Sequence, residues 1–89
     1  MSIGIVFEGA VTEAQYEQVS KEVIKDNKMP AGMLSHVAGP TATGWRVTEV
    51  WETQDAADRF FKETLGAALK RANISVQPTS FDVHNIMTA

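Results

Sequence analysis

The stretch that decides the fold is residues 45–53, Trp-Arg-Val-Thr-Glu-Val-Trp-Glu-Thr. β-Branched and aromatic side chains dominate its first eight residues, which is typical of a β-strand. Successive side chains of a strand point to opposite faces, so residues 45, 47, 49 and 51 share one face. Thr53 is a good helix N-cap, and Asp55 follows it where a negative charge suits the helix dipole. The stretch therefore predicts a strand over 45–52 that leads directly into a helix.

The segment after Thr53 has the periodicity of an amphipathic helix. Its apolar residues form one stripe: Ala57, Phe60, Phe61, Leu65 and Leu69. Gly66 lies within this helix and is a candidate break, since glycine costs about 1 kcal/mol relative to alanine in a helix interior. Asn73 is expected to end the helix in the left-handed conformation, with Ile74 as the hydrophobic contact just beyond it.

The N-terminal part of the chain predicts a strand and a helix. Residues 3–8, Ile-Gly-Ile-Val-Phe-Glu, are short, apolar and β-branched, as expected of a strand. Thr12 and Gln15 have the spacing of a capping box, which marks a helix start. Pro30 is expected to stop this helix, with Asn27 near its last turn.

Two further strands complete the pattern. Met33–Ala38 precedes the stretch quoted above, and the turn-rich residues 39–44 are about the right length for a hairpin. Phe81–Met87 is the last strand. The order strand-helix-strand-strand-helix-strand reads as two βαβ halves, and right-handed crossovers then lead to an α+β, ferredoxin-like fold. We expect residues 1–89 to form one domain with a four-stranded antiparallel sheet and both helices on one face.

Composition narrows the classes of function. With 8 Lys and Arg against 11 Asp and Glu, the net charge of -3 argues against nucleic acid as a partner. No apolar run approaches the roughly 20 residues that span a bilayer, and no basic leader or cleavage site is present, so we expect a cytoplasmic protein without a membrane partner. Without cysteine, ligand-spaced acidic residues or a glycine-rich phosphate loop, neither a metal nor a cofactor is expected.

The predicted sheet has a second apolar face that helices on one side cannot cover. Val6, Val50 and Ile86 are assigned to this face. A chain this short buries only about 60–65% of the surface that it exposes when unfolded, so it has little stability to spare. We therefore expect a homodimer that packs through the sheet. The alternative is a monomer whose mixed sheet face is solvated.

Two runs of sequence resemble a known family. Gly44–Thr53, followed by Ala56-Ala57-x-x-Phe60-Phe61, resembles the junction between the third strand and the second helix of dimeric α+β barrel proteins. The nearest group is the antibiotic biosynthesis monooxygenase-like family with its small uncharacterised relatives, whose closing strand resembles residues 81–86. The resemblance implies homodimers with packed sheets and a small pocket between sheet and helices in each subunit. Because the superfamily includes cofactor-free oxygenases, haem-degrading enzymes and lactone isomerases, it does not imply one reaction.

Trp51 is the residue to which the resemblance assigns a role. It corresponds to a tryptophan of the family's oxygenases and haem degraders, where it suggests an aromatic pocket wall. The alternative is a core residue at the start of the second helix. The haem degraders pair this tryptophan with an asparagine on the first strand and a histidine on the second helix. Both are absent from this sequence, so haem chemistry is not expected.

Glu49 and His84 are the candidate catalytic residues. Glu49 lies on an apolar strand face, where a carboxylate needs a partner or a raised pKa and could remove a proton from an acidic phenol or lactone. The alternative is a structural partner of Tyr16 or of a lysine. His84 is preferred to His36, although either histidine could be a surface or core residue, and on opposite sheet edges they could meet only across a dimer interface. The residues expected to line a ligand pocket are Tyr16, Trp45, Trp51 and Phe60.

Three functions remain open at this stage. The first is a small-molecule-binding dimeric barrel protein with its pocket between sheet and helices. The second is a cofactor-independent monooxygenase or isomerase that acts on an aromatic or lactone-like molecule. The third is a purely structural or assembly module. A pocket that contains Glu49 and Trp51 would favour the first two, and a filled interior would favour the third.

Overall fold

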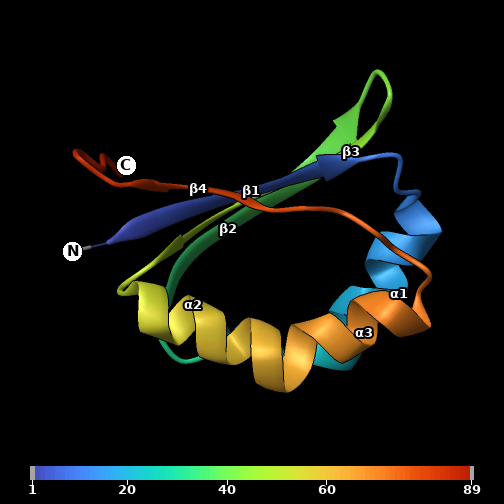
Figure 1. Ribbon diagram of the computed structural model, residues 1–89, viewed down its shortest axis with the longest axis horizontal. Coiled ribbons are helices and arrows are strands. Elements are labelled where there is room, and N and C mark those ends of the chain that lie inside the picture. The colour runs from blue at the N-terminus through green and yellow to red at the C-terminus, as the bar shows by residue number, and fades with distance from the viewer. Residues whose placement is uncertain (1, 89) are drawn as a thin grey trace.

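The computed structural model of the protein describes residues 2–88 as an α+β fold of two layers. Its strands are β1 (Ile3–Gly9), β2 (Met33–Thr41), β3 (Gly44–Trp51) and β4 (Thr79–Asp82). Its helical segments are α1 (Glu13–Val23), α2 (Gln54–Phe60), the π-helical turn η1 (Phe61–Leu65) and α3 (Gly66–Arg71). The strands form an antiparallel sheet in the order β2-β3-β1-β4, and the helices lie along one of its faces (Figure 1). The predicted ferredoxin-like fold is confirmed.

The predicted caps start both helical segments. The Gln15 backbone N–H donates to the Thr12 hydroxyl at 3.1 Å, and the Thr12 N–H donates to the Gln15 side-chain oxygen at 2.9 Å. The Thr53 hydroxyl accepts from the Ala56 N–H at 3.1 Å. These side chains satisfy backbone donors that a helix leaves free at its N-terminus, so both helix starts were readable from local sequence.

The first helix ends earlier than predicted. α1 stops at Val23, and Asp26 and Asn27 have φ values of 55° and 58°. Asp and Asn tolerate this left-handed region better than most residues, so the chain turns there before it reaches Pro30. The prediction that Pro30 stops the helix is therefore wrong, because a local turn stops it first.

The second helix changes its winding instead of breaking at glycine. The Gly66 N–H donates to the Phe61 carbonyl, an i to i+5 bond that defines the π turn. Gly66 itself stays helical, with φ -57° and ψ -45°. A Cβ at Gly66 would lie 3.0 Å from the Phe61 carbonyl oxygen, so the absence of a side chain suits this turn. Further along, Asn73 ends the helix with φ 59° and Ile74 packs against the core, as predicted, and the Ile74 N–H bonds to the Leu69 carbonyl.

The strand bounds differ most from prediction in β2 and β4. β2 extends to Thr41, so Gly39 and Pro40 belong to the strand and the hairpin turn is two residues long. Pro40 is tolerated because β2 is an edge strand. The last strand spans Thr79–Asp82 instead of Phe81–Met87.

The last strand ends where its pairing with the first residues of β1 ends. β4 pairs with β1, whose first paired residue is Ile3, and the Val83 N–H makes one more bond, to the Ser2 carbonyl. Beyond that point the C-terminal segment runs past the sheet (Figure 1). Ile86 therefore does not belong to the outer sheet face, which is a correction.

The core lies between the sheet and the helices in two clusters. One contains Ile3, Met33, Trp51 and Ala57, and the other contains Val19, Leu65, Ala68 and Ala72. Phe60 packs against both clusters. Among residues 2–88, Glu49 is the only buried polar or charged residue.

The opposite sheet face carries exposed apolar side chains. Val37 is 68% exposed and Phe81 is 51% exposed. The Phe81 ring lies over Gly4, where a Cβ would meet it, so it faces away from the helices. Val6 and Val50 share this side by strand alternation. We call the surface formed by Val6, Val37, Val50 and Phe81 the outer face.

Candidate functional site

A cavity of about 90 Å³ lies between the sheet and the helices. Its walls are mostly apolar, with Phe7 and Val47 from the sheet, Val19 from α1 and Leu69 from α3. Since one water needs roughly 10–15 Å³ of such space, the cavity has room for several waters or a small organic molecule. Its polar or polar-tipped lining residues include Tyr16, His36, Trp45 and Glu49.

Glu49 is held by two hydrogen-bond donors. The Trp51 indole N–H donates to Glu49 Oε1 at 3.0 Å, and His36 Nδ1 lies 3.1 Å from Glu49 Oε2. Glu49 is 5% exposed, and a buried carboxylate of this kind is costly unless its oxygens are bonded. The expected partner of Glu49 was Tyr16 or a lysine, but the partners are His36 and Trp51.

The His36 ring continues the chain of bonds to Tyr16. His36 Nε2 lies 2.8 Å from the Tyr16 hydroxyl. A neutral ring with its proton on Nδ1 satisfies both neighbours, because Nδ1–H then donates to Glu49 and Nε2 accepts from Tyr16. The His36 side chain is 29% exposed, so the chain of bonds leads from a buried carboxylate toward solvent. We call Tyr16, His36 and Glu49 the relay.

Tyr16 is held in its neutral form. Burial, with the negative charges of Glu17 and Glu49, raises the pKa of the Tyr16 hydroxyl above its usual value of 10.0. The phenol therefore donates to His36 at neutral pH and keeps oxygen lone pairs free to accept another bond. The Tyr16 ring also packs against Trp45, with centroids 5.2 Å apart and planes tilted by 31°.

The predicted pocket residues and the two catalytic candidates fall into three groups. Tyr16, Trp45 and Phe60 line the first cavity with Glu49. Trp51 does not line it, since it is 1% exposed and packs in the core with its N–H on Glu49. His84 lies exposed on the segment after β4, apart from the relay.

His36 was not favoured by sequence reasoning. Residue pairing in the hairpin places His36 directly opposite Glu49 on neighbouring strands. The alternation of strand faces could have indicated that His36 faces Glu49, but only with the correct register between β2 and β3. With the turn placed at residues 39–44 instead of between Thr41 and Gly44, that register was not available.

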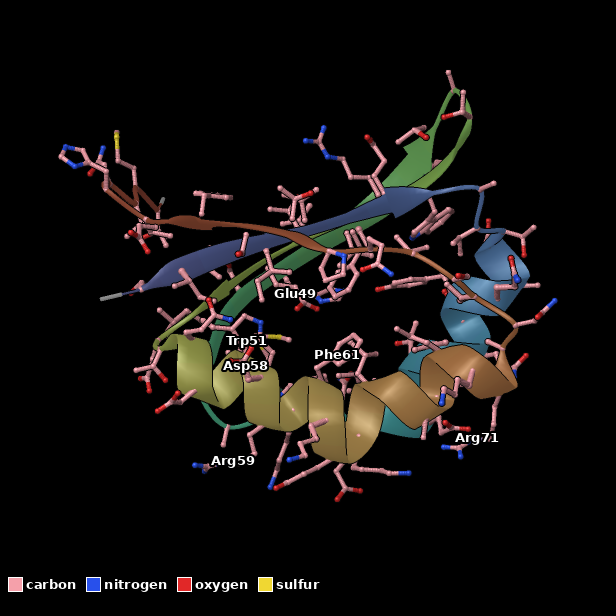
Figure 2. The ribbon with its side chains drawn as sticks, in the orientation of Figure 1. Glu49, Trp51, Asp58, Arg59, Phe61 and Arg71 are labelled. Carbon is pink, nitrogen blue, oxygen red and sulfur yellow. The ribbon has the colours of Figure 1, made fainter. Side chains whose placement is uncertain are left out.

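A second cavity of about 210 Å³ lies beside the first. It contains both Glu49 and Trp51, and Gln54 and Asp58 contribute to its polar lining. Figure 2 shows Glu49 and Trp51 between the sheet and the helices, whereas Arg59 and Arg71 lie on the far side of the helices.

Residues 2–88 contain no group of three or more His, Cys, Asp or Glu side chains placed to hold a metal ion. In the same part of the chain, every helix is too short or too polar to cross a membrane.

Comparison with solved structures identifies known proteins that have this fold. No protein-family model and no curated protein sequence matches the chain. A candidate antibiotic biosynthesis monooxygenase from Chloroflexus aurantiacus superposes with a TM-score of 0.69 at 12% identity, over 99% of this chain and 98% of that one. The chain has the fold of the antibiotic biosynthesis monooxygenases.

Other structures of the antibiotic biosynthesis monooxygenase fold agree. SnoaB, a cofactor-independent oxygenase from Streptomyces nogalater, has a TM-score of 0.63 at 17% identity, over 99% of this chain and 98% of its own. A protein from Mycobacterium tuberculosis has a TM-score of 0.75 at 10% identity, over 99% and 100%. At such identities the shared property is the fold, and a shared fold does not carry a reaction with it.

Proposed function

We propose that this protein binds a small, mostly apolar molecule with a hydroxyl group in the cavity between sheet and helices. The observation that carries the proposal is the relay at the wall of an otherwise apolar cavity. Ligand sites commonly combine apolar walls with a few placed polar groups that orient the ligand. A ligand hydroxyl would donate to Tyr16 Oη, whose own proton is directed to His36. The ligand ring would pack beside Trp45 and Tyr16.

Paired ligands test this function by isothermal titration calorimetry. 4-Ethylphenol should bind more tightly than 4-ethylanisole, its methyl ether, because the ether cannot donate to Tyr16. One such hydrogen bond is worth about 1 kcal/mol, or about five-fold in affinity. Tyr16→Phe should remove this preference and leave the affinity for the anisole unchanged. Equal affinity of the natural protein for both ligands would contradict the proposal.

A second candidate function is proton abstraction for cofactor-independent oxygenation or isomerisation. The relay favours it, because a ligand proton can pass to Tyr16 Oη while the Tyr16 proton moves to His36 Nε2. The resulting imidazolium would be stabilised by the Glu49 carboxylate at 3.1 Å. The ligand anion could then be reprotonated at another carbon, or a methylene could react with dioxygen to give a carbonyl and one water. SnoaB supports the oxygenase form of this proposal through its fold.

Dioxygen uptake distinguishes the second function from binding alone. With any hydroxylated aromatic substrate that is consumed, His36→Gln should lower kcat by about 100-fold or more, as expected for loss of a proton acceptor. His84→Gln replaces the other histidine, which the sequence favoured as a catalytic residue. A loss of rate confined to His84→Gln would contradict the relay.

We further propose that the protein is a homodimer through the outer face. Its exposed Val37 and Phe81 would be removed from water by a second copy, and burial of apolar area is favourable by about 25 cal/mol per Å². The resemblance to dimeric α+β barrels supports the same assembly. The helices and both cavities lie on the other side of the sheet, so the assembly leaves the proposed site within each subunit.

A further inference from the structure

The two cavities share a common wall. Four residues line both of them, with Phe7 and Glu49 on the sheet and Phe60 and Leu65 on the helix. These four residues therefore form the part of the layer between sheet and helices that borders both cavities. The larger cavity lies on one side of this wall and the cavity of Tyr16 and Trp45 on the other.

Phe60 is the largest helix residue in this wall. Its ring packs on Trp51, with centroids 5.4 Å apart and planes tilted by 39°. It is only partly buried, although it touches both core clusters, so part of its surface faces open space. Phe60 thus borders both cavities and also packs against both core clusters.

The π turn explains why two wall residues come from one helix. Phe60 and Leu65 are five residues apart, which would put them on different faces of a regular α-helix at about 100° per residue. The i to i+5 bond from Gly66 to Phe61 widens the turn between them. Both side chains consequently face the sheet. π Turns inside helices are frequent at functional sites.

We propose that Phe60 determines ligand length in this protein, an inference that rests on the proposed binding function. The ring confines a phenolic ligand to the cavity of the relay and closes the passage to the larger cavity. The ligand class is therefore a phenol with a short substituent opposite its hydroxyl. A smaller residue at position 60 would join the cavities and admit one longer ligand that occupies both.

A series of 4-alkylphenols tests this role by isothermal titration calorimetry. Each added methylene should raise the affinity by about four-fold while it is buried. In the natural protein the affinity should stop rising once the alkyl group reaches a limiting length. In Phe60→Ala the rise should continue past that length, which gives the longest phenol an affinity at least about ten-fold above its value in the natural protein.

Two further variants complete the design, and circular dichroism checks that each is folded. Phe60→Leu keeps apolar volume for the core and should shift the limiting length in the same direction. Phe61→Ala removes the same ring one residue later, from a position that lines only the larger cavity, and should leave the limit unchanged.

Each outcome decides between the two proposals. The same limiting length in Phe60→Ala, Phe60→Leu and the natural protein would overturn the role of Phe60 and leave the binding function standing. An equal shift in Phe61→Ala would overturn the assignment to Phe60. Failure of every alkylphenol to bind the natural protein would overturn the binding function and this inference with it.

Discussion

At the scale of single residues, Glu49 organises the site. Its position on the apolar face of β3 followed from strand alternation alone, and this pointed to an unusual role for a carboxylate. Its partners did not follow, because Trp51 lies two residues away but His36 lies thirteen away on another strand. The buried charge was therefore predictable, and the relay that it anchors was not.

Replacing Glu49 by glutamine should destabilise the protein. With the His36 proton on Nδ1, a glutamine side chain can accept from only one of the two donors and turns its own N–H toward the other. Leaving one buried donor unpaired costs about 1–3 kcal/mol, so the free energy of unfolding in urea should fall by about this amount. Glu63→Gln, at an exposed position, is the matched control and should change it by less than about 0.5 kcal/mol. Equal effects of the two substitutions would show that the Glu49 bonds are not stabilising.

Tyr16 should make stability fall at high pH. Its pKa is raised in the folded state above the unfolded value near 10, so the folded state holds the proton more tightly. This stabilisation is fully present below pH 10 and is lost as the pH rises through the raised folded pKa. Urea unfolding across this range should show a steeper loss for the natural protein than for Tyr16→Phe. Tyr16 is the only tyrosine in the chain, so tyrosinate absorbance reports its ionisation directly, and a titration midpoint at or below pH 10 would contradict the raised pKa.

At the scale of elements, local chemistry explains where segments start better than where they end. The caps at Thr12 and Thr53 and the left-handed Asn73 involve contacts within a few residues, and the sequence showed all three. The end of β4 depends on where β1 begins, and the end of α1 depends on a turn at Asp26 and Asn27 that competes with the helix. The π turn had a visible trace in Gly66, although the sequence suggested a break there.

Gly66→Ala tests the π turn. In an ordinary helix interior this substitution raises the free energy of unfolding by about 1 kcal/mol. Here the new Cβ would lie 3.0 Å from the Phe61 carbonyl oxygen, so we expect no gain or a loss. Ala67→Gly, at the next and exposed position of α3, should cost the usual amount of about 1 kcal/mol in the same urea assay. A full gain in Gly66→Ala would contradict the tight contact in this turn.

At the scale of the whole molecule, the helices cover one side of the sheet and leave the outer face exposed. The sequence predicted this imbalance from the number of helices and the alternation of strands. It assigned Ile86 to the outer face, whereas Phe81 takes that role by lying over Gly4. The prediction of a second apolar face thus survives with Val6 and Val50 in place and with Phe81 instead of Ile86.

Light scattering after size exclusion tests the homodimer. The natural protein should elute at twice the chain mass of 9.7 kDa. Val37→Glu should weaken association by about 100-fold or more, because an unpaired carboxylate would be buried in the interface. Val37 is 68% exposed in the single chain, so the substitution should not disturb the fold. Arg59→Glu, on the far side of the helices, is the control (Figure 2). A stable monomer of the natural protein at micromolar concentration would contradict the proposed assembly.

The sequence by itself determined the order of elements, the helix starts and the face on which Glu49 lies. These depend on side-chain periodicity and on bonds between near neighbours, which the chain carries in any context. Only the tertiary structure decided that His36 meets Glu49, that Phe60 bounds two cavities and that the last strand ends at Asp82. Each of these depends on the register of strands or the packing of layers, where residues distant in sequence come into contact.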